Sequence, residues 1–166
     1  MELWDLLDKD RTPLGITHPR GRQYPMPPHT YHTVVSVFTV DIHNRLLLTL
    51  RASTKGMYPG YWEFTGGSGV SGEDSLTSAH RELWEETGLE LYEIDDLIGP
   101  SYSAVGFSNE INVCVVGKAR GAFGKSTSTL EEIEPGWYTK EELRELLKTG
   151  RFAARTQAYC YLWSRQ

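Results

Sequence analysis

Cysteine is scarce in this chain, and long apolar runs are missing. Cys114 and Cys160 are the only cysteines in 166 residues, too few for a disulfide framework, and their valine and tyrosine neighbours predict buried free thiols. No apolar stretch approaches the length of a membrane span. The first ten residues, MELWDLLDKD, carry acids where a secretory signal would carry cations. We therefore expect a cytoplasmic protein without a membrane partner.

Positive charge is also sparse, because the net charge is −5 and no run of basic residues occurs. A surface that binds nucleic acid irrespective of its sequence is therefore not expected. Acidity is compatible with a phosphorylated small molecule if metal ions supply the positive charge. The length suits one ordinary domain with a real core, and no repeat or long linker divides it. We expect a single domain over residues 1–166, in which residues 1–29 form an N-terminal arm.

The hydrophobic pattern predicts strands that alternate with helices. Strands are expected at Leu3–Asp8, Thr33–Val40, Arg45–Arg51, Trp62–Thr65, Leu89–Leu97, Tyr102–Val105, Ile111–Lys118 and Glu131–Tyr138. Helices are expected at Asp74–Thr87, Lys140–Thr149 and Ala153–Ser164, the second opened by a capping box of Thr139 and Glu142. The proline-rich remainder of the arm is expected to be irregular. This order indicates an α/β fold with a mixed central sheet and helices on both faces.

The stretch Gly67–Leu89, GSGVSGEDSLTSAHRELWEETGL, is the centre of the chain's chemistry. In its predicted helix Glu82, Glu85 and Glu86 stand at i, i+3 and i+4 and share one face. Three neighbouring carboxylates repel one another, and a divalent cation would reverse that effect because Mg²⁺ prefers oxygen ligands. Taken alone, the three glutamates favour an acidic, solvated helix face over a metal site.

The spacing over the whole stretch resembles the Nudix box, G-x5-E-x7-R-E-U-x-E-E-x-G-U with U aliphatic, and every fixed position is filled. The resemblance to Nudix hydrolases implies an α/β/α sandwich that holds Mg²⁺ or Mn²⁺ against a diphosphate. It also implies roles for particular residues. These are metal ligation by Glu85, Glu86 and the carbonyl of Gly66, ligation or general-base action by Glu82, and orientation of the ligands by Glu73 and Arg81.

Other candidates lie outside the box. GFSNE (106–110) resembles a loop of ADP-ribose-type Nudix members whose glutamate approaches the metals, so Glu110 is a further candidate ligand, with an ordinary turn as the alternative. An acid among Glu110, Glu131, Glu132 and Glu134 is an alternative general base. Candidate phosphate contacts are Arg51 and Lys55, and candidate stacking surfaces are Tyr58, Tyr61, Tyr102 and Phe107. A solvated loop explains the two cations equally well, and aromatic covers of the core explain the rings.

The upstream half, from WDLLDKD to KGMYPGYWEFTGGS, resembles a Nudix branch that is also similar to isopentenyl-diphosphate isomerase. The isomerase's active-site cysteine and histidine are replaced here by residues of Glu63–Gly67, so His32, near a metal-binding histidine of the isomerase, is interpreted as structural. The resemblance implies a Mg²⁺-dependent pyrophosphohydrolase acting on ADP-ribose, a nucleotide sugar or a nucleotide. Alternatives are an isomerase-like enzyme and a non-catalytic nucleotide-sensing module. A homodimer remains open.

Overall fold

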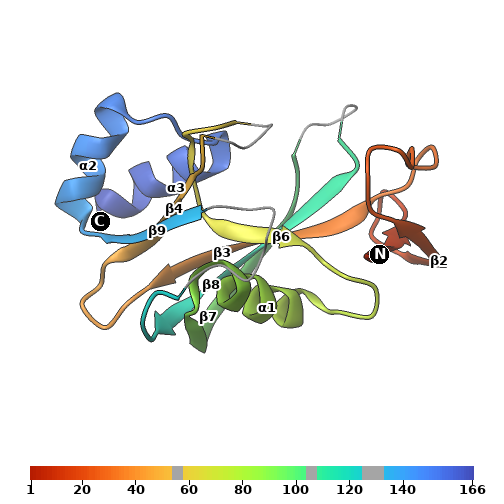
Figure 1. Cartoon of the computed structure of the whole chain (residues 1–166), viewed down its shortest axis with the longest axis horizontal. Helices are drawn as coiled ribbons and strands as arrows, with labels where there is room; N and C mark the ends of the chain where they lie inside the picture. Colours follow the sequence, from red (N-terminus) through yellow and green to blue (C-terminus); the bar gives the residue numbers. More distant parts are fainter. Residues whose placement is uncertain (54–57, 104–107, 125–132) are drawn as a thin grey trace.

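A mixed β-sheet carries helices on both of its faces, which confirms the expected α/β architecture (Figure 1). The structure is a computed structural model that describes residues 1–53, 58–103, 108–124 and 133–166. Helix α1 (Ser75–Thr87) covers one face, and α2 (Lys140–Thr149) and α3 (Ala154–Ser164) cover the other. Within the described ranges, no helix combines the length and the apolar character needed to cross a membrane.

The sheet is centred on two parallel strands, β3 (His32–Val40) and β8 (Glu110–Arg120), which pair along their whole shared length. On one side β7 (Glu90–Tyr102) pairs antiparallel with β8. On the other side, β3 pairs with β6 (Thr65–Ser68) and meets the start of β4 (Leu46–Arg51). Strand β4 in turn pairs with β5 (Trp62–Glu63) and β9 (Ile133–Tyr138).

Alternating side chains of the strands feed two separate cores, as the period of two in a β-strand requires. Leu47 joins a buried cluster with Ala79 and Leu83 of α1. Its neighbours Leu46 and Leu48 point to the opposite cluster, which includes residues of α2 and α3. The central strands of the sheet are therefore buried on both faces, whereas most of β7 is exposed, and α1 packs against β6 and β3.

Helix α1 begins and ends where its sequence dictates. Asp74 is the N-cap and accepts a hydrogen bond from the backbone N–H of Thr77 at 2.8 Å. Gly88 ends the helix with φ 76°, a left-handed conformation that glycine adopts without strain. The capping box predicted at Thr139 and Glu142 is present at the start of α2.

Two expectations about secondary structure are wrong. The arm after its first strand is not irregular throughout, because β1 (Leu3–Leu7) and β2 (Pro13–Pro19) form an antiparallel hairpin. The prolines that suggested a loop stand at the two ends of β2, where a missing backbone N–H is tolerated. The second error concerns β7, which continues as one strand to Tyr102 instead of ending near residue 97. Irregularities in its register, one of them between Ile98 and Ser101, accommodate the turn-forming residues of this stretch.

Candidate active site

Two glycines of β6 let helix α1 lie directly on the sheet. Gly66 and Gly67 pair with β3 opposite Ser36 and Val35. A Cβ added at Gly66 would collide with the carbonyl oxygen of Val35, and one added at Gly67 would collide with the carboxylate of Glu82. The glycines therefore bring the carboxylates of α1 into contact with the backbone of β6, a close approach that no other residue permits.

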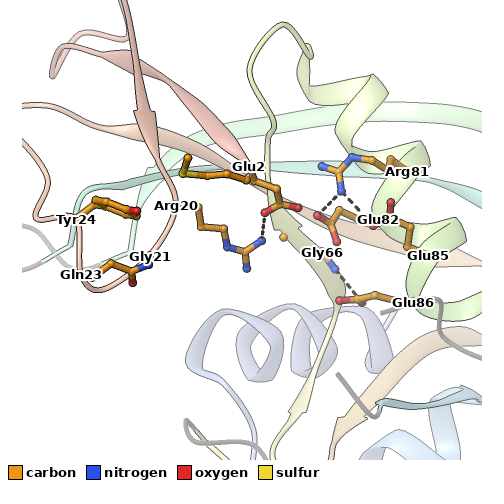
Figure 2. Close-up of a pocket in the computed structure, with 12 residues that line it drawn as sticks. Glu2, Arg20, Gly21, Gln23, Tyr24, Gly66, Arg81, Glu82, Glu85 and Glu86 are labelled. Atoms are coloured by element: carbon orange, nitrogen blue, oxygen red, sulfur yellow. Dashed lines mark hydrogen bonds and ion pairs between the residues drawn. The ribbon is translucent and has the colours of Figure 1, made fainter. Parts of the chain in front are cut away.

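A cavity of about 700 Å³ lies beside these glycines (Figure 2). The residues of β6 and α1 that line it are Gly66, Gly67, Arg81, Glu82, Glu85 and Glu86. The N-terminal arm lines the remainder with Met1, Glu2, Arg20, Gly21, Gln23 and Tyr24. The structure thus gathers the predicted box residues at one cavity and adds a wall from the arm.

Arg81 organises the acids of α1. Its Nε donates to Glu73 at 2.8 Å and one Nη2 donor reaches the second Glu73 oxygen at 2.9 Å. Its Nη1 donates to Glu82 at 2.8 Å and to Glu85 at 3.3 Å. A further bond joins Nη2 to the carbonyl of Ser68 at 3.0 Å. Arg81 therefore fixes three of the four box glutamates and ties the helix to β6.

The same contacts shift the ionisation of the partners. Hydrogen bonds from Arg81 lower the pKa of Glu73 from 4.5 to about 2, assisted by the backbone N–H of Val70 and the hydroxyl of Ser78. The hydrogen bond with Glu73 in turn raises the pKa of Arg81 above its usual value. Both groups are charged at neutral pH, so the orientation of Arg81 is independent of pH in the physiological range.

The carboxylates of Glu82 and Glu86 are withdrawn from solvent, whereas Glu85 stands at the cavity mouth. Glu82 is 8% exposed and Glu86 is 6% exposed, whereas the side chain of Glu85 is 43% exposed. The hydroxyl of Thr65 donates to Glu86, and the N–H of Gly66 lies 3.4 Å from the same oxygen. Burial of a carboxylate is costly unless donors or cations compensate it.

The donor set fits a divalent cation such as Mg²⁺ or Mn²⁺. Glu82, Glu85, Glu86 and the Gly66 carbonyl all offer oxygen, and hard cations prefer oxygen ligands. In the described part of the chain, no three carboxylate, imidazole or thiolate groups are gathered at ligand spacing. Glu82 instead faces Arg81, and Glu86 faces Thr65. Metal ligation by these residues stays a prediction and would require their carboxylates to turn toward a common point.

Among the residues that the structure describes, the candidate acids, cations and tyrosines outside the box do not line this cavity. Glu110 begins β8 opposite His32, and Glu134 is exposed on β9; among the described residues, neither lines the cavity. Arg51 forms an ion pair with Glu63 at 2.8 Å. Lys55, Phe107, Glu131 and Glu132 lie outside the described residues.

The candidate stacking tyrosines contact neighbours away from the cavity. The rings of Tyr58 and Tyr61 meet edge to face with centroids 5.3 Å apart. The hydroxyl of Tyr102 donates to the carbonyl of Lys9 in the arm, and its ring lies edge-on to Tyr31. These contacts show where the rings lie and leave their role in stacking a prediction.

His32 is buried beneath the arm. Its ring stacks on Trp4 with centroids 3.8 Å apart and planes inclined by 2°. Burial lowers the pKa of His32 despite the nearby Glu110. This packing fits the interpretation of His32 as a structural residue.

Sequence reasoning missed the arm side of the cavity, Glu2, Arg20 and Tyr24 above all. The arm carries prolines and glycines that suggested irregular structure, and no motif marked its residues. The available signal was the β-branched pair Ile16 and Thr17 in the middle of β2, which is typical of a strand.

Comparison with known proteins agrees with the fold. The family model for the NUDIX domain matches residues 30–159. The chain is 31% identical over 154 residues to an uncharacterised Nudix hydrolase, lin0387, of Listeria innocua, covering 92% of this chain and 88% of that one. It is 38% identical over 90 residues to lmo0368 of Listeria monocytogenes, covering 54% of this chain and about half, 52%, of that one.

Two further proteins are similar to this chain, one in sequence and one in fold. An isopentenyl-diphosphate Delta-isomerase of Frankia alni is 31% identical over 148 residues, covering 84% of this chain and 73% of that one. The crystal structure of the MutT protein from Methanosarcina mazei has a TM-score of 0.63 at 21% identity, covering 81% and 94% of the two chains. The chain therefore belongs to the Nudix hydrolase family, a class of enzymes that hydrolyse phosphoanhydride bonds.

Proposed function

We propose that this chain is a pyrophosphohydrolase that depends on Mg²⁺ or Mn²⁺ and cleaves a nucleoside diphosphate derivative between its two phosphates. ADP-ribose, a nucleotide sugar and a nucleotide are the candidate substrates. The observation that supports the proposal is the cavity in which the buried carboxylates of Glu82 and Glu86 lie against the two glycines of strand β6. A diphosphate in this cavity needs positive charge beside it. The carboxylates can provide that charge by binding a metal ion.

The bound cation would supply a water of lowered pKa and would neutralise charge on the phosphate that leaves. Glu85, Glu86 and the Gly66 carbonyl are the proposed ligands. Arg81 fixes the Glu82 carboxylate beside the cavity through its 2.8 Å hydrogen bond. We assign Glu82 to metal binding or to accepting the proton of the attacking water, because an ionised, oriented carboxylate can perform either task.

The isomerase-like alternative lacks support from side chains at the site. Thr65 stands in the short stretch after Trp62 where the related isomerase carries a catalytic residue, and its hydroxyl donates to Glu86. Cys114 and Cys160 are both fully buried and do not line the cavity. Burial also raises the pKa of both thiols, to about 11 and about 12, which suits inert core residues. Free thiols are typical of proteins in a reducing compartment, so a cytoplasmic location is part of the proposal.

A panel of nucleotides tests this function. ADP-ribose, nucleotide sugars, and nucleoside di- and triphosphates are incubated with Mg²⁺ or Mn²⁺ in ¹⁸O-labelled water, and the products are identified by mass spectrometry. The expected result is a nucleoside monophosphate, with label in one of the two products. Conversion of isopentenyl diphosphate without phosphate release, with every nucleotide left intact, would contradict it.

A further inference from the structure

The N-terminal arm forms one whole wall of the cavity, yet it lies outside the matched family region. That region begins at residue 30, whereas the arm residues that line the cavity lie within residues 1–24. Figure 2 shows them across the cavity from the acids of α1. A substrate that occupies the cavity must therefore meet groups that the box does not supply.

The arm is held against the box by hydrogen bonds to the loop before α1. The backbone N–H of Ser71 donates to the carbonyl of Leu3 at 2.7 Å. The carboxylate of Asp5 accepts from the Ser71 hydroxyl at 2.6 Å and from the Gly72 N–H at 2.7 Å. The wall is thus built onto the same loop that leads into the catalytic helix.

Packing fixes the arm from its other side. Leu6 is fully buried, and Trp4 covers the ring of His32. Leu7 and Tyr31 exchange backbone hydrogen bonds of 2.8 and 2.9 Å. Because the hairpin is attached at several points, its side chains occupy defined positions beside the cavity.

Two of those side chains carry opposite charge. Arg20 Nη1 lies 2.6 Å from a carboxylate oxygen of Glu2, and both side chains are about half exposed, at 47% and 46%. The backbone also joins them, since the N–H of Arg20 donates to the Glu2 carbonyl at 3.0 Å. A half-exposed pair of this kind contributes little net stability, so a competing anion can replace Glu2 at small cost.

The two arginines of the cavity differ in what they can offer a ligand. Arg81 makes five hydrogen bonds to protein oxygens, which is the full donor capacity of a guanidinium. In the described part of the chain, the Arg20 side chain has a single acceptor, Glu2. Arg20 is therefore the cation that can donate to an incoming anion without dismantling the box.

We propose that Arg20 binds the anionic end of the substrate that points away from α1, and that Glu2 is the internal competitor of that anion. The inference rests on the proposed function, because it assumes that a diphosphate group occupies the cavity. Guanidinium and phosphate match in a planar, two-point hydrogen bond, which an ammonium cannot reproduce. The arm would then select substrates that carry negative charge at this distance from the metal-binding acids.

The proposal requires opposite effects from the two halves of one ion pair. Arg20→Ala removes the donor and should weaken anion binding by about ten- to hundred-fold, the usual range for a charge-assisted hydrogen bond. Glu2→Gln removes the competitor and its charge, and should strengthen binding by a few-fold. A purely structural ion pair would make both variants change in the same direction.

Isothermal titration calorimetry with methylenediphosphonate and Mg²⁺ measures this directly, because the probe cannot be hydrolysed. Arg22→Ala is the matched control, since Arg22 is exposed on the same segment and does not line the cavity. The expected order of Kd is Arg20→Ala weakest, then wild type and Arg22→Ala together, then Glu2→Gln tightest. Arg20→Lys should recover only part of the loss.

The thermal unfolding midpoint of each variant separates binding from folding. If Arg20→Ala and Glu2→Gln lower the midpoint alike and leave Kd unchanged, the pair is structural and the proposal is overturned. Equal Kd values for Arg20→Ala and Arg22→Ala would overturn it as well. The readout does not depend on turnover, so a nucleotide panel without cleavage would defeat the proposed function and leave this comparison intact.

Discussion

Arg81 and Glu73 face each other in a two-point ion pair, with Nε 2.8 Å from one carboxylate oxygen and Nη2 2.9 Å from the other. Glu73 also accepts hydrogen bonds from the Ser78 hydroxyl at 2.8 Å and the Val70 N–H at 3.1 Å. It does not line the cavity, so its contact with the site runs through Arg81 alone. This geometry fits the predicted role of Glu73 as a residue that orients Arg81, which in turn contacts Glu82 and Glu85.

Arg81→Lys should lower kcat/KM by about 10- to 100-fold while the protein stays folded, as is typical when a partner of metal ligands is lost. An ammonium has three donors on a flexible stem, so it cannot replace the five hydrogen bonds that the rigid guanidinium of Arg81 makes. Steady-state kinetics measure the effect. Arg120→Lys is the matched control, because Arg120 forms a largely exposed ion pair with Glu90 on the surface. Similar kcat/KM values for the two variants would contradict the prediction that Arg81 orients the acids of the site.

The acid stability of the fold should depend on Glu73. Its pKa is about 2 in the folded chain and near 4.5 when unperturbed, so the ionised form stabilises the fold above pH 4.5. That contribution is lost as pH falls from 4.5 toward 2. Chemical unfolding of wild type and Glu73→Gln should therefore differ at pH 7, and the difference should shrink below pH 4.5. If the difference in unfolding free energy between the two proteins stayed constant across this pH range, the ion pair would not be the source of the stability.

The box could be predicted from sequence because its helix is local. The spacing of Glu82, Glu85 and Glu86 and the glycine at position 88 specify a helix face and its end, and the structure has both. The side-chain contact of Glu86 with a distant strand could not be predicted. Thr65 meets Glu86 across 21 positions of sequence, a contact that depends on the pairing of β6 with β3.

The arm shows the opposite limit of sequence reasoning. Hairpin β1–β2 is stabilised by strand pairing and by its contacts with Ser71 and His32, which no local pattern encodes. Its prolines dominate the local propensity, and they therefore led to a prediction of irregular structure. Tertiary contacts overrode that propensity. Because the hairpin was not predicted, the positions of Arg20 and Glu2 beside the cavity were not predicted either.

Glu86→Gln should reduce kcat by more than about 100-fold, since the loss of even an indirect partner of a metal ligand costs 10- to 100-fold. Glutamine keeps the volume of the side chain but removes the charge that a cation needs. Activity at limiting Mg²⁺ provides the measurement, and circular dichroism checks the fold. Glu145→Gln is the control, because Glu145 is exposed on α2 and pairs only with Lys148 among the described residues. Wild-type activity in the Glu86 variant would exclude it as a ligand.

Gly67→Ala should damage the site more than the fold. A Cβ at this position would collide with the Glu82 carboxylate, which is the far end of a flexible side chain and must shift. Activity should therefore fall, while the free energy of unfolding should change by less than the cost of overpacking a core, which is about 1–3 kcal/mol. Urea unfolding and activity are the measurements. Gly124→Ala is the control, because its Cβ would meet only ordinary contacts, and unchanged activity at position 67 would show that Glu82 tolerates displacement.

Divalent metal should raise the thermal unfolding midpoint through the same acids. In the structure, Glu82 and Glu86 are buried and Glu85 stands beside them, so three like charges share one helix face. A cation that binds only the folded chain stabilises it by mass action, by about 2.7 kcal/mol at one hundred times its Kd. Differential scanning fluorimetry with increasing Mg²⁺ or Mn²⁺ measures the shift, and Na⁺ at equal ionic strength controls for screening. Glu85→Gln and Glu86→Gln should each reduce the metal-induced shift of the midpoint. A shift of the same size in wild type and both variants would place the metal elsewhere on the protein.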